Sequence, residues 1–253
     1  TEDISALEVG LYILQLTAPD GCVTSYTYNV LSNSVTIAEN IVDASCNGGS
    51  DGDIDLTVTG GTIPYGYLWS NGATSPNLNN VLAGIYSVTV TDGTGCTEAL
   101  SNLTIQQPSA LIASAYVSSS YNGEDVTCYG ASDGQITANV SGGVGSYTYS
   151  INNSSYSSNN VFNTLTASLY SISYKDGNGC ITTEDISLSQ PPQLQSFLTS
   201  SNDISCFGAM DGSIDITISG GTPNSSSPSY NVSWLATNGY TSGSTNLSNI
   251  MQD

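Results

Sequence analysis

One pattern recurs along the 253-residue chain with a period near 80 residues, and a cysteine stands at each of its ends. The opening cysteines Cys46, Cys128 and Cys206 are 82 and 78 residues apart. Such a period is too long for one solenoid unit, but it suits a small domain that buries its own core and is repeated in tandem. We therefore expect a string of small domains.

The repeat divides the chain into two complete copies and two partial ones. The predicted parts are the closing half of a copy at 1–33, complete copies at 34–108 and 109–191, and the opening part of a copy at 192–253. Gln107-Pro108 and Gln190-Pro191-Pro192 lie between copies, where proline stiffens a linker. We expect the chain to be a segment of a much longer protein, whose signal peptide and anchor would lie elsewhere.

Alternating apolar and polar residues predict β-strands throughout. Val9 to Leu16 and Tyr86 to Val90 follow the two-residue period of a half-buried strand, and no segment of useful length has the helical period. About seven short strands per copy, with turns about every 8 to 12 residues, are typical of an immunoglobulin-like sandwich. The sequence thus predicts an all-β fold of tandem immunoglobulin-like β-sandwich domains arranged as an extended rod.

Aromatic residues at strand spacing are predicted to fill the core. Tyr65, Tyr67 and Trp69 share one face of the third strand of their copy, and Trp234 stands in the place of Trp69 in the last copy. A tyrosine corner, whose hydroxyl bonds to the backbone of the preceding connection, lies at the start of the penultimate strand. That position is occupied by Tyr12, Tyr86 and Tyr170.

Six cysteines in repeated positions predict disulfides and an oxidising, extracellular location. Pairing within a copy would join Cys46 to Cys96 and Cys128 to Cys180. In an immunoglobulin-like strand order, however, the opening and closing cysteines lie at opposite poles, roughly 25 Å apart for strands of this length. A disulfide needs Cα atoms within about 7 Å.

Two other pairings remain open. If successive domains stack head to tail, the closing hairpin of one copy meets the opening loop of the copy before it, and Cys46 can bond to Cys180. Cys96 and Cys128 would then need partners outside this segment. The third scheme pairs neighbours in sequence: Cys22–Cys46, Cys96–Cys128 and Cys180–Cys206. An opening cysteine placed before the first paired strand would favour the bridge within a copy instead.

The charge of the chain excludes several classes of function. Lys175 is its single basic residue, against 21 acidic residues, and the net charge is −20. Nucleic acids and anionic membrane surfaces are therefore not expected as partners, because both are bound through Lys and Arg. No apolar run approaches the roughly 18 residues of a transmembrane helix. Without His, Arg or a recognisable carboxylate pair, the chain is not expected to be an enzyme.

Calcium is the one cofactor that the sequence suggests. Asp43 and Asp51 at one pole of a copy, facing Asp176 of the next, are candidate ligands, since carboxylate oxygens are what calcium prefers. Only the first Asp-Gly of the Asp51-Gly-Asp53 stretch recurs in the other copies, and no EF-hand loop is present. The alternative interpretation of Asp51 is a turn residue that caps its own loop.

The pattern C-x-G-x-x-D-G-x-I, then Gly-Gly, then an aromatic strand and L-x-x-G-x-Y-x-V-x-V-x-D-x-x-G-C resembles the SprB repeat. That family occurs in very large surface adhesins of gliding bacteria, which are exported by the type IX secretion system. The copy opening at Cys46 matches best. The next copy departs from the pattern with Ile151 in place of the strand tryptophan and Ser168 in place of a glycine.

The resemblance implies a structural role at the cell surface. The chain would be a stalk segment of a long adhesin filament, a gliding-motility adhesin that links the cell to a substratum such as polysaccharide. Its immediate partners would be neighbouring repeats of the same chain. The alternative is a carbohydrate- or protein-binding module, for which the insert Pro223 to Ser229 in the last copy is the best candidate.

Overall fold

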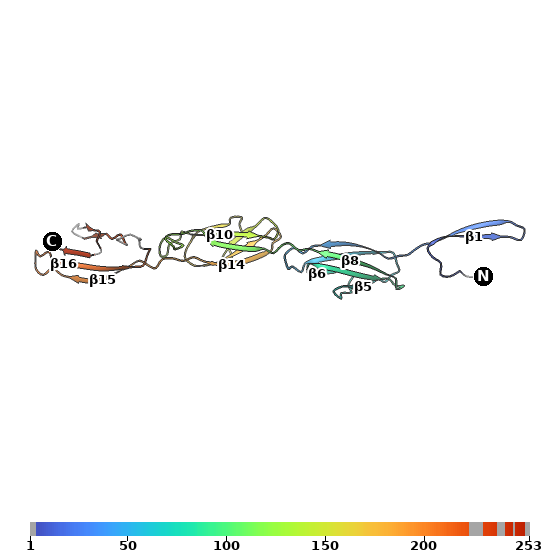
Figure 1. Ribbon diagram of the computed structural model, residues 1–253, viewed down its shortest axis with the longest axis horizontal. Helices are drawn as coiled ribbons and strands as arrows, with labels where there is room; N and C mark the ends of the chain where they lie inside the picture. Colours follow the sequence, from blue (N-terminus) through green and yellow to red (C-terminus); the bar gives the residue numbers. More distant parts are fainter. Residues whose placement is uncertain (1–3, 223–229, 237–240, 245, 251–253) are drawn as a thin grey trace. The chain divides into compact units, whose positions relative to one another are not determined.

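The computed structural model describes residues 4–222, 230–236, 241–244 and 246–250 (Figure 1). Every regular element among these residues is a β-strand. The chain divides into two compact units, residues 1–109 and 110–253. The insert from Pro223 to Ser229 lies outside the described residues.

The first unit begins with a hairpin of two strands, β1 (Gly10–Thr17) and β2 (Val23–Val30). The strands pair in one unbroken antiparallel register, and Gly21 takes the positive φ of 88° that the turn requires. Apolar side chains along the hairpin are exposed, Ile13 to 68%. They are exposed because a two-stranded sheet cannot bury a face by itself. The same strand pair closes each complete repeat.

The first complete repeat is a sandwich of two three-stranded antiparallel sheets. One sheet has the order β3-β4-β6 and the other β5-β7-β8. The strands are β3 (Thr36–Val42), β4 (Gly52–Thr59), β5 (Gly66–Trp69), β6 (Leu78–Val81), β7 (Gly84–Thr91) and β8 (Thr97–Ile105). This arrangement confirms the predicted immunoglobulin-like fold.

The strand count differs from the prediction, because the repeat has six strands where about seven are expected. Leu78 to Val81 are too few to show a two-residue period, but they form β6 and pair with β4. Residues 70–77 cross from one sheet to the other through the Asn71-Gly72 turn, in which the Gly72 N–H donates to the Trp69 carbonyl. Those eight residues leave no room for an additional strand.

The second unit repeats this topology. Its complete sandwich has the sheets β9-β10-β12 and β11-β13-β14. The strands are β9 (Ile112–Val117), β10 (Gly134–Ser141), β11 (Thr148–Ile151), β12 (Val161–Leu165), β13 (Leu169–Lys175) and β14 (Ile181–Ser187). The register shifts at the same place in each copy, between Gly52 and Ile54 in β4 and between Gly134 and Ile136 in β10.

The last copy contains the first sheet and part of the second. Its strands are β15 (Gln195–Asn202), β16 (Gly212–Ser219), β17 (Trp234–Leu235), β18 (Thr241–Ser242) and β19 (Asn246–Ile250). They form a sheet of order β15-β16-β19 and a separate pair β17-β18. Among the described residues, this copy has no counterpart of the closing strands β7 and β8.

The side chains that fill each core are set by the alternation of inward and outward residues along the strands. In the first complete repeat the buried side chains include Ile54, Trp69, Val88 and Val90, which all point between the two sheets. In the second complete repeat Ile151 stands where Trp69 would be, and it is only partly buried. Two tyrosines, Tyr149 and Tyr174, fill that core instead.

Tyr149 and Tyr174 pack edge to face in the second complete repeat, with ring centroids 5.8 Å apart and an angle of 75° between the planes. Tyr174 is fully buried. Burial, followed by the neighbouring carboxylate of Glu184, raises the pKa of the Tyr174 hydroxyl. A tyrosine pair therefore takes over the volume that tryptophan fills one copy earlier.

Candidate functional site

The ends of the repeats carry the recurring polar contacts, so they form the candidate functional site. One such contact is the tyrosine corner, in which each hydroxyl donates to a backbone oxygen four residues earlier. The bonds are Tyr12 to Glu8 at 2.7 Å, Tyr86 to Leu82 at 2.8 Å and Tyr170 to Thr166 at 2.8 Å. Each bond ties the start of the penultimate strand to the connection before it.

A second tyrosine is tied to the Gly-Gly turn. The hydroxyl of Tyr147 donates to the Gly142 carbonyl at 2.6 Å, and that of Tyr230 donates to Gly220 at 2.8 Å. Tyr65 makes the same bond to Gly60. These tyrosines therefore hold the turn that ends the second strand of each copy.

The strand tryptophans are also held by hydrogen bonds. Trp69 is 2% exposed, and its Nε1–H donates to the Ser75 carbonyl at 2.9 Å. Trp234 is half-buried and donates in the same way to Ser244 at 2.7 Å. A ring as buried as Trp69 offers no face on which a sugar could stack.

A buried aspartate organises each closing hairpin. The Asp92 carboxylate accepts bonds from the backbone N–H groups of Thr62, Thr94 and Cys96, each at 2.9 Å, and from the Thr94 hydroxyl at 2.7 Å. The Thr94 hydroxyl and then the Thr62 amide stabilise the charged form, so the pKa of Asp92 falls to about 2. The carboxylate thereby positions the backbone of the closing cysteine.

Asp176 has the same role in the second unit. It accepts bonds from the backbone N–H groups of Val144 at 2.9 Å, Asn178 at 3.0 Å and Cys180 at 2.9 Å. Burial acts to raise the pKa of Asp176, but these backbone donors together hold it below its ordinary value. Both carboxylates are thus ionised and fully engaged in holding a hairpin.

The opening loop has its own aspartate cap. The Asp133 carboxylate accepts bonds from the backbone N–H and the hydroxyl of Thr127, at 3.1 and 2.6 Å. Asp51 caps Ser45 in the same way. In both loops the hydroxyl bond is the main reason why the pKa of the aspartate lies below its ordinary value. In each loop the donor, Ser45 or Thr127, is the residue immediately before the opening cysteine.

The predicted calcium ligands are all occupied by hydrogen bonds to protein. Asp43 accepts the Gln106 N–H at 2.7 Å, Asp51 caps Ser45, and Asp176 holds its hairpin. Within the described ranges, no group of three or more His, Cys, Asp or Glu side chains is placed to hold a metal ion. The contacts of Asp51 are those of a residue that caps its own loop, and calcium binding stays a prediction.

The glutamine of each linker is fixed to the opening loop of its own repeat. The Gln107 side-chain oxygen accepts the Gly48 N–H at 2.6 Å, and that of Gln190 accepts the Gly130 N–H at 2.9 Å. The sequence identifies these segments as linkers but does not reveal this role of glutamine. The one available signal is that each glutamine follows its glycine by nearly the same number of residues, 59 and 60.

The linker into the last copy is also held by the copy that it enters. The Pro192 carbonyl accepts the Gly221 N–H at 2.7 Å. A Cβ on Gly220, whose φ is 79°, would lie 2.0 Å from the Gln193 carbonyl oxygen. Only glycine permits this approach of the turn to the linker. Pro191, between the two attachments, is fully buried.

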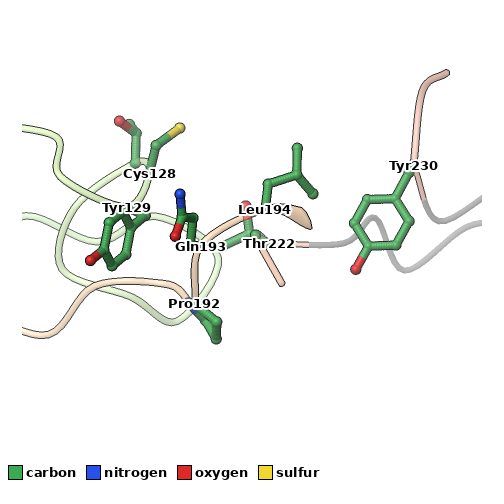
Figure 2. Close-up of a pocket in the computed structure, with 9 residues that line it drawn as sticks. Cys128, Tyr129, Pro192, Gln193, Leu194, Thr222 and Tyr230 are labelled. Carbon is green, nitrogen blue, oxygen red and sulfur yellow. The ribbon is translucent and has the colours of Figure 1, made fainter. Parts of the chain in front are cut away.

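A cavity of about 400 Å³ lies at this linker. Figure 2 shows Cys128 and Tyr129 on one side of the linker residues and Tyr230 on the other. The cavity is lined by Thr127, Cys128, Tyr129, Pro192, Gln193, Leu194, Gly221, Thr222 and Tyr230. It therefore joins the opening loop of one copy to the Gly-Gly turn of the next, both within the second unit.

The cysteines fall into two groups. Cys46 and Cys180 are disulfide-bonded. Four others are free and exposed thiols: Cys22, Cys96, Cys128 and Cys206. These four have no disulfide partner among the described residues, and disulfides from them to cysteines elsewhere in a longer chain stay a prediction. Pairing within a copy and pairing of sequence neighbours both require bonds to free cysteines, so neither scheme is present.

The position of β8 explains why a bridge within a copy does not form. The closing hairpin, with Cys96, lies at the start of β8. The opening loop, with Cys46, lies at its other end, where the Ala44 N–H donates to the Gln106 carbonyl at 2.9 Å. Nine residues of strand separate the two by about 30 Å, far beyond the reach of a disulfide.

A comparison with models of protein families finds the same repeat that the sequence pattern predicts. The family model described as "SprB repeat" matches residues 38–74, 120–155 and 198–235. The chain contains SprB repeats in tandem at these three positions. These repeats are structural adhesin repeats of surface proteins, not an enzyme family, and the disulfide-bonded cysteines fit an oxidising environment outside the cell.

Solved structures are similar to the SprB-repeat chain at low identity. One contains three N-terminal domains of the highly immunogenic outer capsid protein Hoc of bacteriophage RB49, with 15% identity, 77% of this chain and 71% of that chain covered, and a TM-score of 0.36. Another contains domains 4–9 of surface layer protein SbsC, with 14% identity, 85% and 38% covered, and a TM-score of 0.23. The search of curated proteins found no match. None of the described segments is a helix that could cross a bilayer.

Proposed function

We propose that these repeats form a load-bearing stalk segment of a long surface adhesin, of the kind that links a gliding cell to a substratum. The observation that carries the proposal is the double attachment of the linker at residues 190–193. Gln190 holds the opening loop of the copy before it, and Pro192 accepts a bond from the copy after it. Such a joint limits bending, which a stalk that transmits force requires.

The surface chemistry supports the same role. The net charge of −20, with Lys175 as the single base, makes neighbouring filaments repel each other. The carboxylates at the domain ends are engaged in holding backbone, and the conspicuous aromatic Trp69 is buried. A stalk needs stable ends and sides that do not associate, and it does not need an open catalytic cleft.

The stiffness of the joint can be measured directly. Spin labels on non-natural residues at the exposed positions Thr183 and Thr217 would report the distance between two successive copies by double electron–electron resonance. We expect a narrow distance distribution, which Gln190→Ala should broaden. Gln195→Ala, at an exposed position on β15, is the matched control and should change nothing. A broad distribution in the unaltered chain would contradict a stiff joint.

The place of the repeats in the parent adhesin needs a test on cells. Antibodies against the folded repeats should label the surface of intact source cells and leave attachment to the substratum intact, because a stalk does not contact the substratum. Loss of attachment, together with a saturable signal from the isolated chain on a glycan array, would instead support the binding-module alternative.

A further inference from the structure

The cavity at the linker leaves one reactive group without a partner among the described residues. Cys128 is a free, exposed thiol, and it lines the cavity together with Thr222 and Tyr230 of the following copy (Figure 2). A free thiol is not a site by itself. The contacts of the complete repeats indicate which segment of the following copy would lie at this cavity.

In the complete repeats, the residue after the Gly-Gly turn contacts the closing hairpin. In the first complete repeat this residue is Thr62, whose N–H donates to Asp92 at 2.9 Å while its carbonyl accepts the Gly93 N–H at 2.6 Å. Asp92 also accepts the N–H of Cys96. The closing cysteine and the residue after Gly-Gly are therefore held by one carboxylate.

The second complete repeat has the same geometry. Val144 donates to Asp176 at 2.9 Å and accepts the Gly177 N–H at 2.9 Å. Asp176 accepts the Cys180 N–H at 2.9 Å. In both complete repeats, then, the closing hairpin rests on the residue that follows the Gly-Gly turn.

Thr222 is that residue in the last copy, and it lines the same cavity as Cys128. Residues 206–253 contain no counterpart of the closing hairpin. A hairpin that completed this copy by the same contacts would rest on Thr222. Its cysteine would then lie at the cavity, next to Cys128.

The bonded cysteines supply an independent observation. Cys46 occupies the same loop position as Cys128, one copy earlier, and it is disulfide-bonded. Cys180, a closing cysteine, is disulfide-bonded as well. Both classes of cysteine therefore form bridges in this protein, although the length of β8 excludes a bridge within one copy.

We propose that the cavity is the docking site for the closing hairpin of the following repeat, and that Cys128 forms a disulfide with the cysteine of that hairpin. The two thiols give up two protons and two electrons to a disulfide oxidant, which is reduced to its dithiol as the S–S bond forms. The inference rests on the proposed stalk function and adds a covalent lock to the joint.

The full chain extended after Asp253 by a copy of residues 169–191 tests the proposal. Ile250 pairs with Gly212 as Leu165 pairs with Gly134, so the added residues continue the last copy in register. After treatment with oxidised glutathione, non-reducing digestion and mass spectrometry should recover a peptide that joins Cys128 to the copied cysteine. Cys128→Ser should leave the copied cysteine open to maleimide, and the matched change Cys22→Ser should leave the new bridge intact.

Two results would overturn the proposal. One is a bridge from the copied cysteine to Cys206; the other is an unbridged pair of thiols while the added strands are protected from hydrogen exchange. If the added strands do not fold, the Thr222→Cys variant of the unextended chain provides the test. A short bis-maleimide should link the new cysteine to Cys128. Failure to link them would contradict the placement of Thr222 and Cys128 at one cavity. The spin-label distances need no oxidant, so failure of the stalk proposal would be seen separately.

Discussion

The Asp92 carboxylate accepts a hydrogen bond from the Thr62 N–H, thirty residues earlier in the chain, at 2.9 Å. The bond fastens the closing hairpin to the Gly-Gly turn. Because Asp176 and Val144 repeat the relationship at the same distance, it is a property of the repeat and not of one loop. The stability of the repeat should therefore depend on the charge of this aspartate.

We predict that the first complete repeat loses stability in acid. The pKa of Asp92 is lowered to about 2, below the value of about 3.9 for an unfolded chain. The stabilisation is therefore complete above the unfolded pKa and is lost as the pH falls toward 2. Thermal unfolding followed by Trp69 fluorescence, in a Trp234→Phe background, should show this loss. Asp92→Asn should lower the melting temperature at pH 7 and flatten the acid dependence.

Glu98→Gln is the control for the acid experiment, because Glu98 is exposed on β8 in the same repeat. It should leave both the melting temperature at pH 7 and its fall in acid nearly unchanged. An Asp92→Asn chain with the same acid profile as the unaltered chain would show that Asp92 is not the group that titrates.

A second prediction concerns the tyrosine corner. Tyr86→Phe removes the bond to the Leu82 carbonyl and should lower the free energy of unfolding by about 1 kcal/mol. Tyr67→Phe is the matched control, since Tyr67 packs against the same core and its hydroxyl has no hydrogen bond among the described residues. Urea unfolding observed through Trp69 would measure both, and equal losses would mean that the corner bond adds nothing.

Alanine substitutions at two glycines distinguish the cost of backbone strain from the cost of a steric clash. Gly60 has a φ of 72°, and a Cβ there would lie 2.1 Å from the Ser34 carbonyl oxygen. Gly72 has a φ of 86°, and a Cβ there would meet no atom of the described chain within 4 Å. Gly72→Ala should therefore cost only the left-handed backbone penalty of about 1–2 kcal/mol. Gly60→Ala should cost more, and equal melting temperatures for the two variants would refute the close approach of the Gly-Gly turn to Ser34.

The thiols should differ in reactivity. Before reduction, maleimide should label four cysteines, namely Cys22, Cys96, Cys128 and Cys206, because these are free and exposed. Cys46 and Cys180 should react only after reduction. Mapping of the bonded peptides would then test the pairing of Cys46 with Cys180 that head-to-tail stacking predicts. A peptide joining Cys46 to Cys96 would contradict the strand order described here.

The sequence predicts the fold well where side chains alternate over many residues. Strands such as β1 and β7 are long enough for the two-residue period to be clear, and the fold class is confirmed. β6 is not recognisable, because four residues cannot show a period and its pairing with β4 depends on tertiary structure.

The candidate site is harder to predict because its contacts are polar and distant in sequence. Nothing local distinguishes Gln107, which holds the opening loop, from Gln106, whose side chain is exposed. The Asp92 network is equally hidden, since its bond to Thr62 spans thirty residues. The cysteines were open to three pairings because the sequence shows their spacing, whereas the distance between the ends of β8 decides which bridges can form.

The hydrogen bond from the Gly48 N–H to the Gln107 side chain can be tested by amide exchange. Gln107→Ala removes the acceptor of the Gly48 N–H, so this amide should exchange with solvent faster, on the order of five- to tenfold for the loss of one hydrogen bond. The neighbouring Gly49 N–H, which donates to the Cys46 carbonyl, should keep its protection if the loop stays folded. Gln106→Ala is the matched control, because it changes the same residue type one position earlier and should leave both amides as they are. Unchanged exchange at Gly48 in the Gln107→Ala chain would show that the Gln107 side chain does not hold the opening loop.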